Sequence, residues 1–123
     1  MIFRTRTSKR TMEIFDAIYQ REYLQPFALA KISIALSLRS KYKYTGELSD
    51  TQGLDLNRQT ITGEYDLLYK KLIENNEGKS LEDEEYFPNY IKAYLDHGAV
   101  LLEQEYKYSN DFYIHLVDLD KGI

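Results

Sequence analysis

The sequence predicts a mainly α-helical protein: a compact single domain of about four to five helices that assembles as a homo-oligomer. Its 123 residues are enough for one domain with a hydrophobic core of its own. One central stretch is apolar on nearly all sides of a helix, and three further stretches carry apolar residues at helical spacing. Two short segments, residues 2–6 and 112–117, favour an extended conformation instead.

The central stretch, residues 24–40, is predicted to form a buried helix around which the rest of the chain packs. Pro26 fits the first helical turn, where its missing N–H costs little. We expect Lys31 and Arg39 to lie on the least covered stripe, because a buried unpaired charge is costly. The stretch is too short to span a bilayer, which needs ~20 apolar residues. A chain of this size can hardly enclose one helix, so part of its surface is expected to contact a second copy.

Before this helix, residues 2–6 are expected to be extended, and Thr7 or Ser8 caps a helix that runs to about Tyr23. After it, residues 40–57 lack a clear period and contain Gly46 and Gly53. This composition indicates an ordered surface loop.

Two helices are predicted in the second half of the chain. Thr62 caps the first, which has a regular apolar stripe of Tyr65, Leu68, Tyr69, Leu72 and Ile73. The second begins after Pro88 and continues to about Lys107, and Gly98 lies on its apolar face, where another backbone can approach closely. Residues 112–117 form either a strand or, within residues 108–123, a tail that binds a partner.

Charge is distributed unevenly along the chain, although the net charge is −4. Residues 1–44 carry nine Lys or Arg against three Asp or Glu, whereas residues 45–123 carry seven against seventeen. Such asymmetry indicates either a surface that binds a polyanion or a solvated dipole without function. The alternation of lysine and tyrosine in residues 41–44 suits a nucleic-acid backbone, or else a helix end whose lysines favour the dipole.

Catalytic patterns are lacking. The chain has no cysteine, which excludes disulfides and a persulfide-carrying role and fits a cytoplasmic protein. His97 and His115 are not at a metal-ligand spacing, and His97 is expected on a helix surface. The acidic run of residues 82–85 fits a solvated helix start better than a cation site. The sequence therefore predicts no enzyme activity, no metal and no cofactor.

Two blocks of sequence resemble a known family. Residues 29–38 (LAKISIALSL) and residues 57–66 (NRQTITGEYD) resemble DndE, the small subunit of the bacterial DNA phosphorothioation (DNA sulfur modification) system. The resemblance implies a mostly helical homotetramer that binds DNA, with a preference for nicked duplex, and acts with the other Dnd proteins. The second block implies a structural motif of Asn57, Thr60, Thr62, Gly63 and Glu64.

The charge asymmetry and this resemblance together predict a non-catalytic DNA-binding or scaffold subunit. The residues expected to contact phosphate are Arg4, Arg6, Lys9, Arg10, Lys31, Lys41, Lys43 and Arg58. Arg58 has a second interpretation, a bidentate pair with Glu64 that holds the loop. Two other functions remain open: a repressor of the ribbon-helix-helix type, in which paired strands read base edges, and a structural adaptor that binds only partner proteins.

Overall fold

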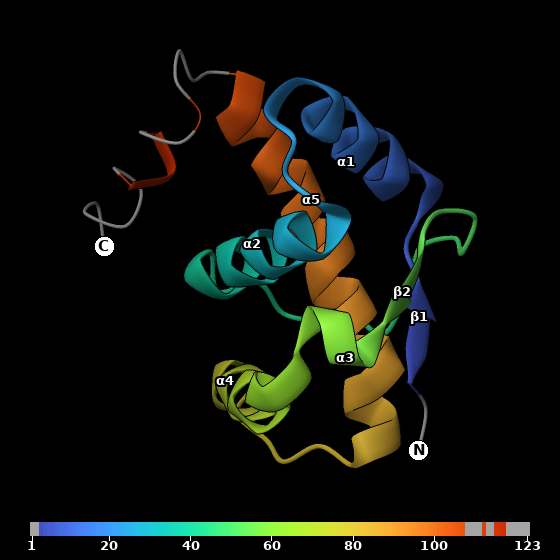
Figure 1. The fold of residues 1–123 in the computed structure, drawn as a ribbon. Helices are drawn as coiled ribbons and strands as arrows, with labels where there is room; N and C mark the ends of the chain where they lie inside the picture. Colours follow the sequence, from blue (N-terminus) through green and yellow to red (C-terminus); the bar gives the residue numbers. More distant parts are fainter. Residues whose placement is uncertain (1–2, 108–111, 113–114, 118–123) are drawn as a thin grey trace.

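In a computed structural model of the chain, helices α2 (Pro26–Arg39) and α5 (Ile91–Lys107) cross in the middle of the molecule and form its most extensive helix pair (Figure 1). The close approach depends on Gly98, because a Cβ there would lie 1.7 Å from the carbonyl oxygen of Ser33. Ser37 also faces this contact and donates a hydrogen bond of 2.6 Å to the Tyr94 carbonyl. The predicted close backbone approach at Gly98 is therefore confirmed, and α2 supplies the approaching backbone.

The structure describes residues 3–107, 112 and 115–117. The remaining elements are β1 (Arg4–Arg6), α1 (Lys9–Glu22), β2 (Asp55–Asn57), α3 (Arg58–Ile61), the turn η1 (Gly63–Tyr65), α4 (Asp66–Glu77) and the turn η2 (Glu85–Tyr90). Figure 1 shows α1 and α4 on opposite sides of α2. The expected mainly helical single domain is confirmed. Within the described residues, no helix has the length and apolar character that a membrane crossing requires.

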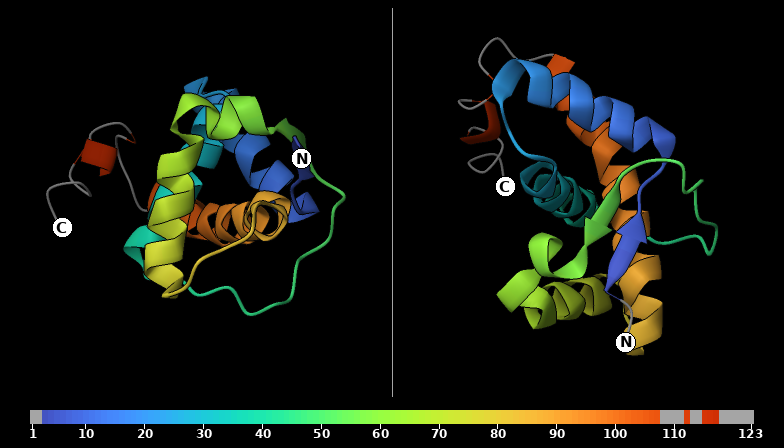
Figure 2. Two further views of the ribbon diagram at one scale, coloured as in Figure 1. Left: turned by 90° about the horizontal axis from the view of Figure 1, so that it is seen from below. Right: turned by 45° about the vertical axis from the view of Figure 1, so that its right-hand side comes forward.

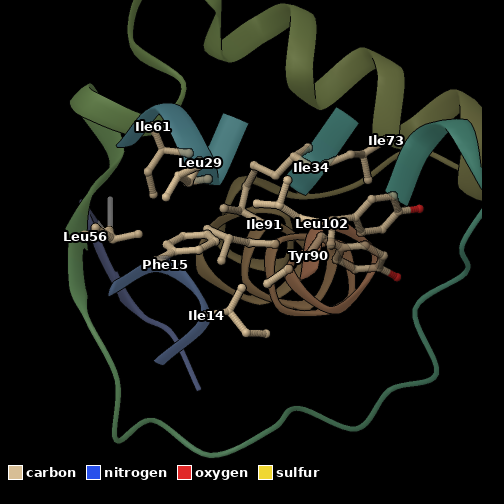
Figure 3. Packing of buried hydrophobic residues seen from close by; sticks show 14 of the residues in the cluster. Ile14, Phe15, Leu29, Ile34, Leu56, Ile61, Ile73, Tyr90, Ile91 and Leu102 are labelled. Carbon is tan, nitrogen blue, oxygen red and sulfur yellow. The ribbon is translucent and has the colours of Figure 1, made fainter. Parts of the chain in front are cut away.

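The core lies between α1, α2, α3 and α5 (Figure 3). Phe15 from α1, Leu29 and Ile34 from α2, and Ile91 and Leu102 from α5 are fully buried. The predicted least covered stripe of α2 is confirmed, since Lys31 and Arg39 are both exposed. Burial of each such side chain contributes ~1.5–3 kcal/mol, so the contacts among these three helices are a major source of stability.

The two short strands form an antiparallel sheet beside α5 (Figure 2). Thr5 pairs with Leu56, and both side chains face the core, whereas Arg4 and Arg6 point outward. The extended N-terminal segment was predicted, but its partner was not, because residues 55–57 lie inside the stretch expected to be a loop. A three-residue strand has too short a pattern to be recognised without its neighbour.

The start of the third predicted helix is wrong by several residues. Asn57, and not Thr62, caps a helix here: it begins the four-residue α3, and α4 starts only at Asp66. Thr62 ends α3, and its hydroxyl donates a hydrogen bond of 2.6 Å to the Asp66 carboxylate. A capping side chain and a side chain that closes a turn have the same sequence signature, and the fold decides between them.

The apolar stripe of α4 is not buried as expected. Of its predicted members only Ile73 is buried, while Tyr65, Leu68 and Leu72 are 58%, 54% and 43% exposed. Leu67 beside them is 67% exposed. Near the C-terminus, residues 112 and 115–117 are helical, so the strand expected over residues 112–117 is wrong there; the rest of the predicted tail lies outside the described residues.

Candidate nucleic-acid interface

Four exposed cations lie close together along the chain on β1 and the first turn of α1, and we call them the N-terminal basic segment: Arg4, Arg6, Lys9 and Arg10. The Arg4 Nε lies 3.1 Å from Asp55 Oδ1, and the Arg10 Nη2 lies 2.6 Å from Glu103 Oε1. Within the described residues, Arg6 and Lys9 form no ion pair. These two side chains are therefore the ones most available to an external anion.

The position of Lys9 and Arg10 is unfavourable for the helix itself. Both lie in the first turn of α1, which has no acidic residue, and the helix dipole disfavours cations at that end. Two backbone N–H groups there already have internal partners: Ser8 N–H donates to Asp96 (3.1 Å) and Lys9 N–H donates to Asp50 (2.9 Å). An anion at this end would therefore be bound mainly by the side chains.

The other predicted phosphate contacts are dispersed. Lys31 lies on α2, where its Nζ stands 5.6 Å from the Phe27 ring centroid. Lys41 and Lys43 are exposed on the loop after α2, and Lys43 Nζ lies 3.5 Å from the side-chain oxygen of Asn76.

The tyrosines that alternate with these lysines pack inward. The Tyr42 ring stacks on His97 with a centroid distance of 4.1 Å, and Tyr44 packs edge-on against Tyr90 at 4.8 Å. Burial raises the pKa of both tyrosines and lowers that of His97. His97 is thus a half-buried packing residue, in contrast to the expected surface position, and Tyr42 and Tyr44 anchor a loop whose lysines face outward.

Arg58 is buried, with 7% of its surface exposed, and binds two carboxylates. Its Nε and Nη2 donate to Asp66 at 3.1 and 2.7 Å, and its Nη1 and Nη2 donate to Asp83 at 3.2 and 2.7 Å. The guanidinium also lies over the rings of Tyr86 and Phe87, at 5.4 and 4.9 Å. This geometry gives Arg58 a structural role and removes it from the exposed cations.

Hydrogen bonds from Arg58 keep both carboxylates of this cluster ionised. The pKa of Asp83 is lowered mainly by its bond from Arg58. For Asp66, burial raises the pKa, but hydrogen bonds from Arg58, Thr62 and Tyr86 outweigh it and the pKa is lowered. The two carboxylates therefore hold their negative charge opposite the guanidinium.

The predicted structural motif of residues 57–64 shapes the turn between β2 and α4. The Asn57 side chain accepts from Gln59 N–H at 2.7 Å, and the Thr60 hydroxyl donates to the Asn57 carbonyl at 2.8 Å. Gly63 has a φ of +53°, a conformation that favours glycine. Glu64 is exposed and forms no ion pair with Arg58, so the predicted Arg58–Glu64 pair is wrong.

Sequence reasoning missed a buried ion pair beneath the basic segment. The Lys92 Nζ lies 2.9 Å from Asp96 Oδ2, and the two side chains are only 4% and 10% exposed. Their spacing of four residues on a helix face was a usable signal. Within the described residues, no group of three or more His, Cys, Asp or Glu is arranged to hold a metal ion.

The fold and the exposed cations define a small, mainly helical protein with a basic N-terminal surface. Comparison with protein families places it more closely: the family model described as "DNA sulphur modification protein DndE" matches residues 4–110. The chain belongs to the DndE family. No curated protein matches the sequence.

Two solved structures share this fold. One is DndE from Escherichia coli B7A, involved in DNA phosphorothioation modification, with 20% identity and a TM-score of 0.65 over 83% of this chain and 97% of that one. The other is a glycine-to-lysine mutant of DndE, involved in DNA phosphorothioation, with 19% identity and a TM-score of 0.58 over 82% and 97% of the two chains. The family and the pairing of β1 with β2 of the same chain both go against the ribbon-helix-helix alternative.

Proposed function

We propose that this chain is a non-catalytic DNA-binding subunit of a DNA phosphorothioation complex and acts with the other Dnd proteins. The observation that carries the DNA-binding role is the N-terminal basic segment. Arg6 and Lys9 are exposed without an ion pair among the described residues, and Lys9 and Arg10 oppose the helix dipole, so helix stability does not explain them. Lysine and arginine side chains that neutralise phosphates supply most sequence-independent DNA affinity.

The non-catalytic role is supported by the use of the charged groups inside the domain. Asp66 and Asp83 both bind Arg58, and Lys92 and Asp96 bind the backbone and each other. These strongly held groups serve structure and leave DNA contact to exposed lysine and arginine side chains. Lys31, Lys41 and Lys43 are further proposed contacts.

DNA binding is tested by fluorescence anisotropy with nicked, intact and single-stranded DNA of one sequence at several salt concentrations. We expect Arg6→Ala/Lys9→Ala to weaken binding to all three DNAs and to lower the slope of log K against log salt by about one unit per lost contact. The matched control is Arg39→Ala/Lys79→Ala, which removes one arginine and one lysine from two exposed sites on other segments.

Wild-type affinity and slope in the Arg6/Lys9 variant would contradict the proposed surface. Absence of DNA binding by the wild type at low salt, together with tight binding to a Dnd partner, would favour the adaptor alternative.

We also propose that the chain forms a homo-oligomer, a tetramer by resemblance to the family, through the outer face of α4. Three large exposed apolar side chains recur on this face at helical spacing, Tyr65 at the end of η1 and Leu68 and Leu72 on α4, and an exposed apolar patch typically marks a protein interface. The exposed stripe of α2 suits an interface less well because it carries Lys31 and Arg39.

Changing this face should dissociate the oligomer without unfolding the subunit. We expect Leu68→Ser/Leu72→Ser to lower the molar mass measured by light scattering, because both side chains are already exposed in the subunit. Leu48→Ser, at a loop leucine that is 42% exposed, is the control and should keep the wild-type mass. A wild type that stays monomeric at all concentrations would refute the assembly.

A further inference from the structure

A buried lysine connects α5 to the backbone of the N-terminal basic segment. The Lys92 ammonium, 4% exposed, donates to the Arg6 carbonyl at 2.7 Å, the Asp50 carbonyl at 2.7 Å and Asp96 Oδ2 at 2.9 Å. All three of its hydrogens are therefore used. Two of the three acceptors are main-chain atoms of segments that are distant in sequence from α5.

Asp96 completes the same network from the other side of the ion pair. Its Oδ1 accepts from Ser8 N–H at 3.1 Å and from the Thr11 hydroxyl at 2.7 Å, and its Oδ2 accepts from the Ser49 hydroxyl at 2.6 Å as well as from Lys92. Both carboxylate oxygens are thus saturated. The ion pair joins α5, the start of α1 and the loop at residues 49–50.

The loop in turn holds the backbone of residues 7–9. Asp50 Oδ1 accepts from Lys9 N–H at 2.9 Å. Thr7 exchanges backbone hydrogen bonds with Gly53 and Leu54, at 2.9 and 2.8 Å. Gly53 fits only without a side chain, since a Cβ would lie 2.1 Å from the Ser8 carbonyl oxygen.

These hydrogen bonds hold the main chain of residues 6–9, the same segment that carries the exposed side chains of Arg6 and Lys9. Replacement of a buried ion pair by apolar residues is often neutral for stability, so the ion pair is weak evidence for a role in stability. A two-stranded sheet with three-residue strands is also too small to order the segment without support.

We propose that Lys92 is a positioning residue for DNA binding: it holds the backbone of residues 6–9 so that Arg6, Lys9 and Arg10 are pre-arranged for phosphate. The inference rests on the proposed DNA-binding function and adds a residue to it that never touches DNA. Pre-arrangement raises affinity because the segment does not have to be ordered on binding.

The test is Lys92→Met/Asp96→Asn, which removes both charges and keeps side chains of similar size. We expect about a tenfold loss of DNA affinity with an unchanged salt slope, since the number of phosphate contacts stays the same. Amide hydrogen exchange of residues 6–9 should accelerate. The matched control is Lys79→Met/Glu84→Gln, the same chemical change at two exposed sites, and it should behave as wild type.

A double-mutant cycle separates positioning from general destabilisation. In an Arg6→Ala/Lys9→Ala/Arg10→Ala background, the change at Lys92 and Asp96 should cost at most about twofold in affinity, because the side chains being positioned are absent. An equal loss in both backgrounds, wild-type affinity, or unchanged amide exchange at residues 6–9 would each overturn the inference.

A milder variant provides a second test if Lys92→Met/Asp96→Asn does not fold. Thr11→Val removes one donor to Asp96 without changing charge or size, and we expect it to weaken DNA binding by about threefold with faster amide exchange at Ser8. Unchanged affinity in this variant would count against the inference. Failure of the proposed DNA-binding function can be told apart from failure of the positioning role, because in the first case the wild-type protein itself would not bind DNA.

Discussion

Arg58 binds two carboxylates that come from different segments: Asp66 begins α4, and Asp83 lies just before η2. Tyr86 adds a hydrogen bond of 3.0 Å from its hydroxyl to Asp66, so the cluster connects α3, α4 and η2. An arginine with a planar fork suits this geometry, since it presents paired donors to each carboxylate. Arg58 was predicted either to contact phosphate or to form a structural ion pair. Its burial decides for a structural role, which the neighbouring sequence could not do.

Removal of the guanidinium should be strongly destabilising. We expect Arg58→Met to lower the free energy of unfolding by ~3–5 kcal/mol, because two partly buried carboxylates lose their counter-charge. Urea unfolding followed by circular dichroism measures the change. Arg39→Met, at an exposed arginine on α2, is the control and should change the stability by less than ~0.5 kcal/mol. A loss below ~1 kcal/mol for Arg58→Met would contradict the structural role.

At the level of elements, the crossing of α2 and α5 depends on small residues on both helices. Gly98 on α5 and the buried Ser33 and Ser37 on α2 let the two backbones meet. The sequence predicted a close approach at Gly98 from the position of a glycine on an apolar face. The sequence did not indicate which helix approaches Gly98, because the backbone of any helix could pack against a glycine there.

A methyl group at this crossing should force the helices apart. We expect Gly98→Ala to cost at least ~2 kcal/mol of stability and to lower the melting temperature, since the new Cβ would meet the Ser33 backbone. Gly78→Ala is the matched control: it has open space around it and a φ of +77°, so its cost is limited to ~1 kcal/mol of backbone strain. Equal costs for the two variants would contradict the packing argument.

The pattern of α4 shows the limit of periodicity as a guide to burial. Its apolar stripe has regular helical spacing, yet only Ile73 is buried and Leu67, outside the stripe, is the most exposed of its leucines. An apolar face has the same sequence pattern whether it meets the core of its own subunit or another protein. The helix was therefore predictable from the spacing of its apolar residues, whereas the exposure of its apolar face was not.

For the whole molecule, the Arg58 cluster also sets how stability responds to acid. The pKa values of Asp66 and Asp83 are lowered in the folded state, so each contributes stability that is present above its unfolded pKa of about 3.9 and lost as the pH falls through the folded value. We expect the free energy of unfolding to fall below about pH 4. Urea unfolding between neutral and acid pH measures this.

The control is the same titration of Arg58→Met, in which the acid-induced loss should be smaller because both carboxylates lose the hydrogen bonds from Arg58 that lower their pKa values. Among the described residues, the other carboxylates with a lowered pKa are Asp50 and Glu74. Both are unchanged in this variant, so the difference between the two curves reports the cluster. Parallel curves would show that Arg58 does not set the acid response.

The sequence by itself determined the helical class, the bounds of α1, α2 and α5, the exposed stripe of α2, the basic N-terminal surface and the family resemblance. These properties depend on local spacing, capping and charge order, which act over a few residues. Only the tertiary structure decided the pairing of β1 with β2, the partners of Arg58, the exposure of α4 and the position of Lys92 beneath the basic segment. Each of these is a contact between residues far apart in the chain, and a contact of this kind exists only once the helices have packed.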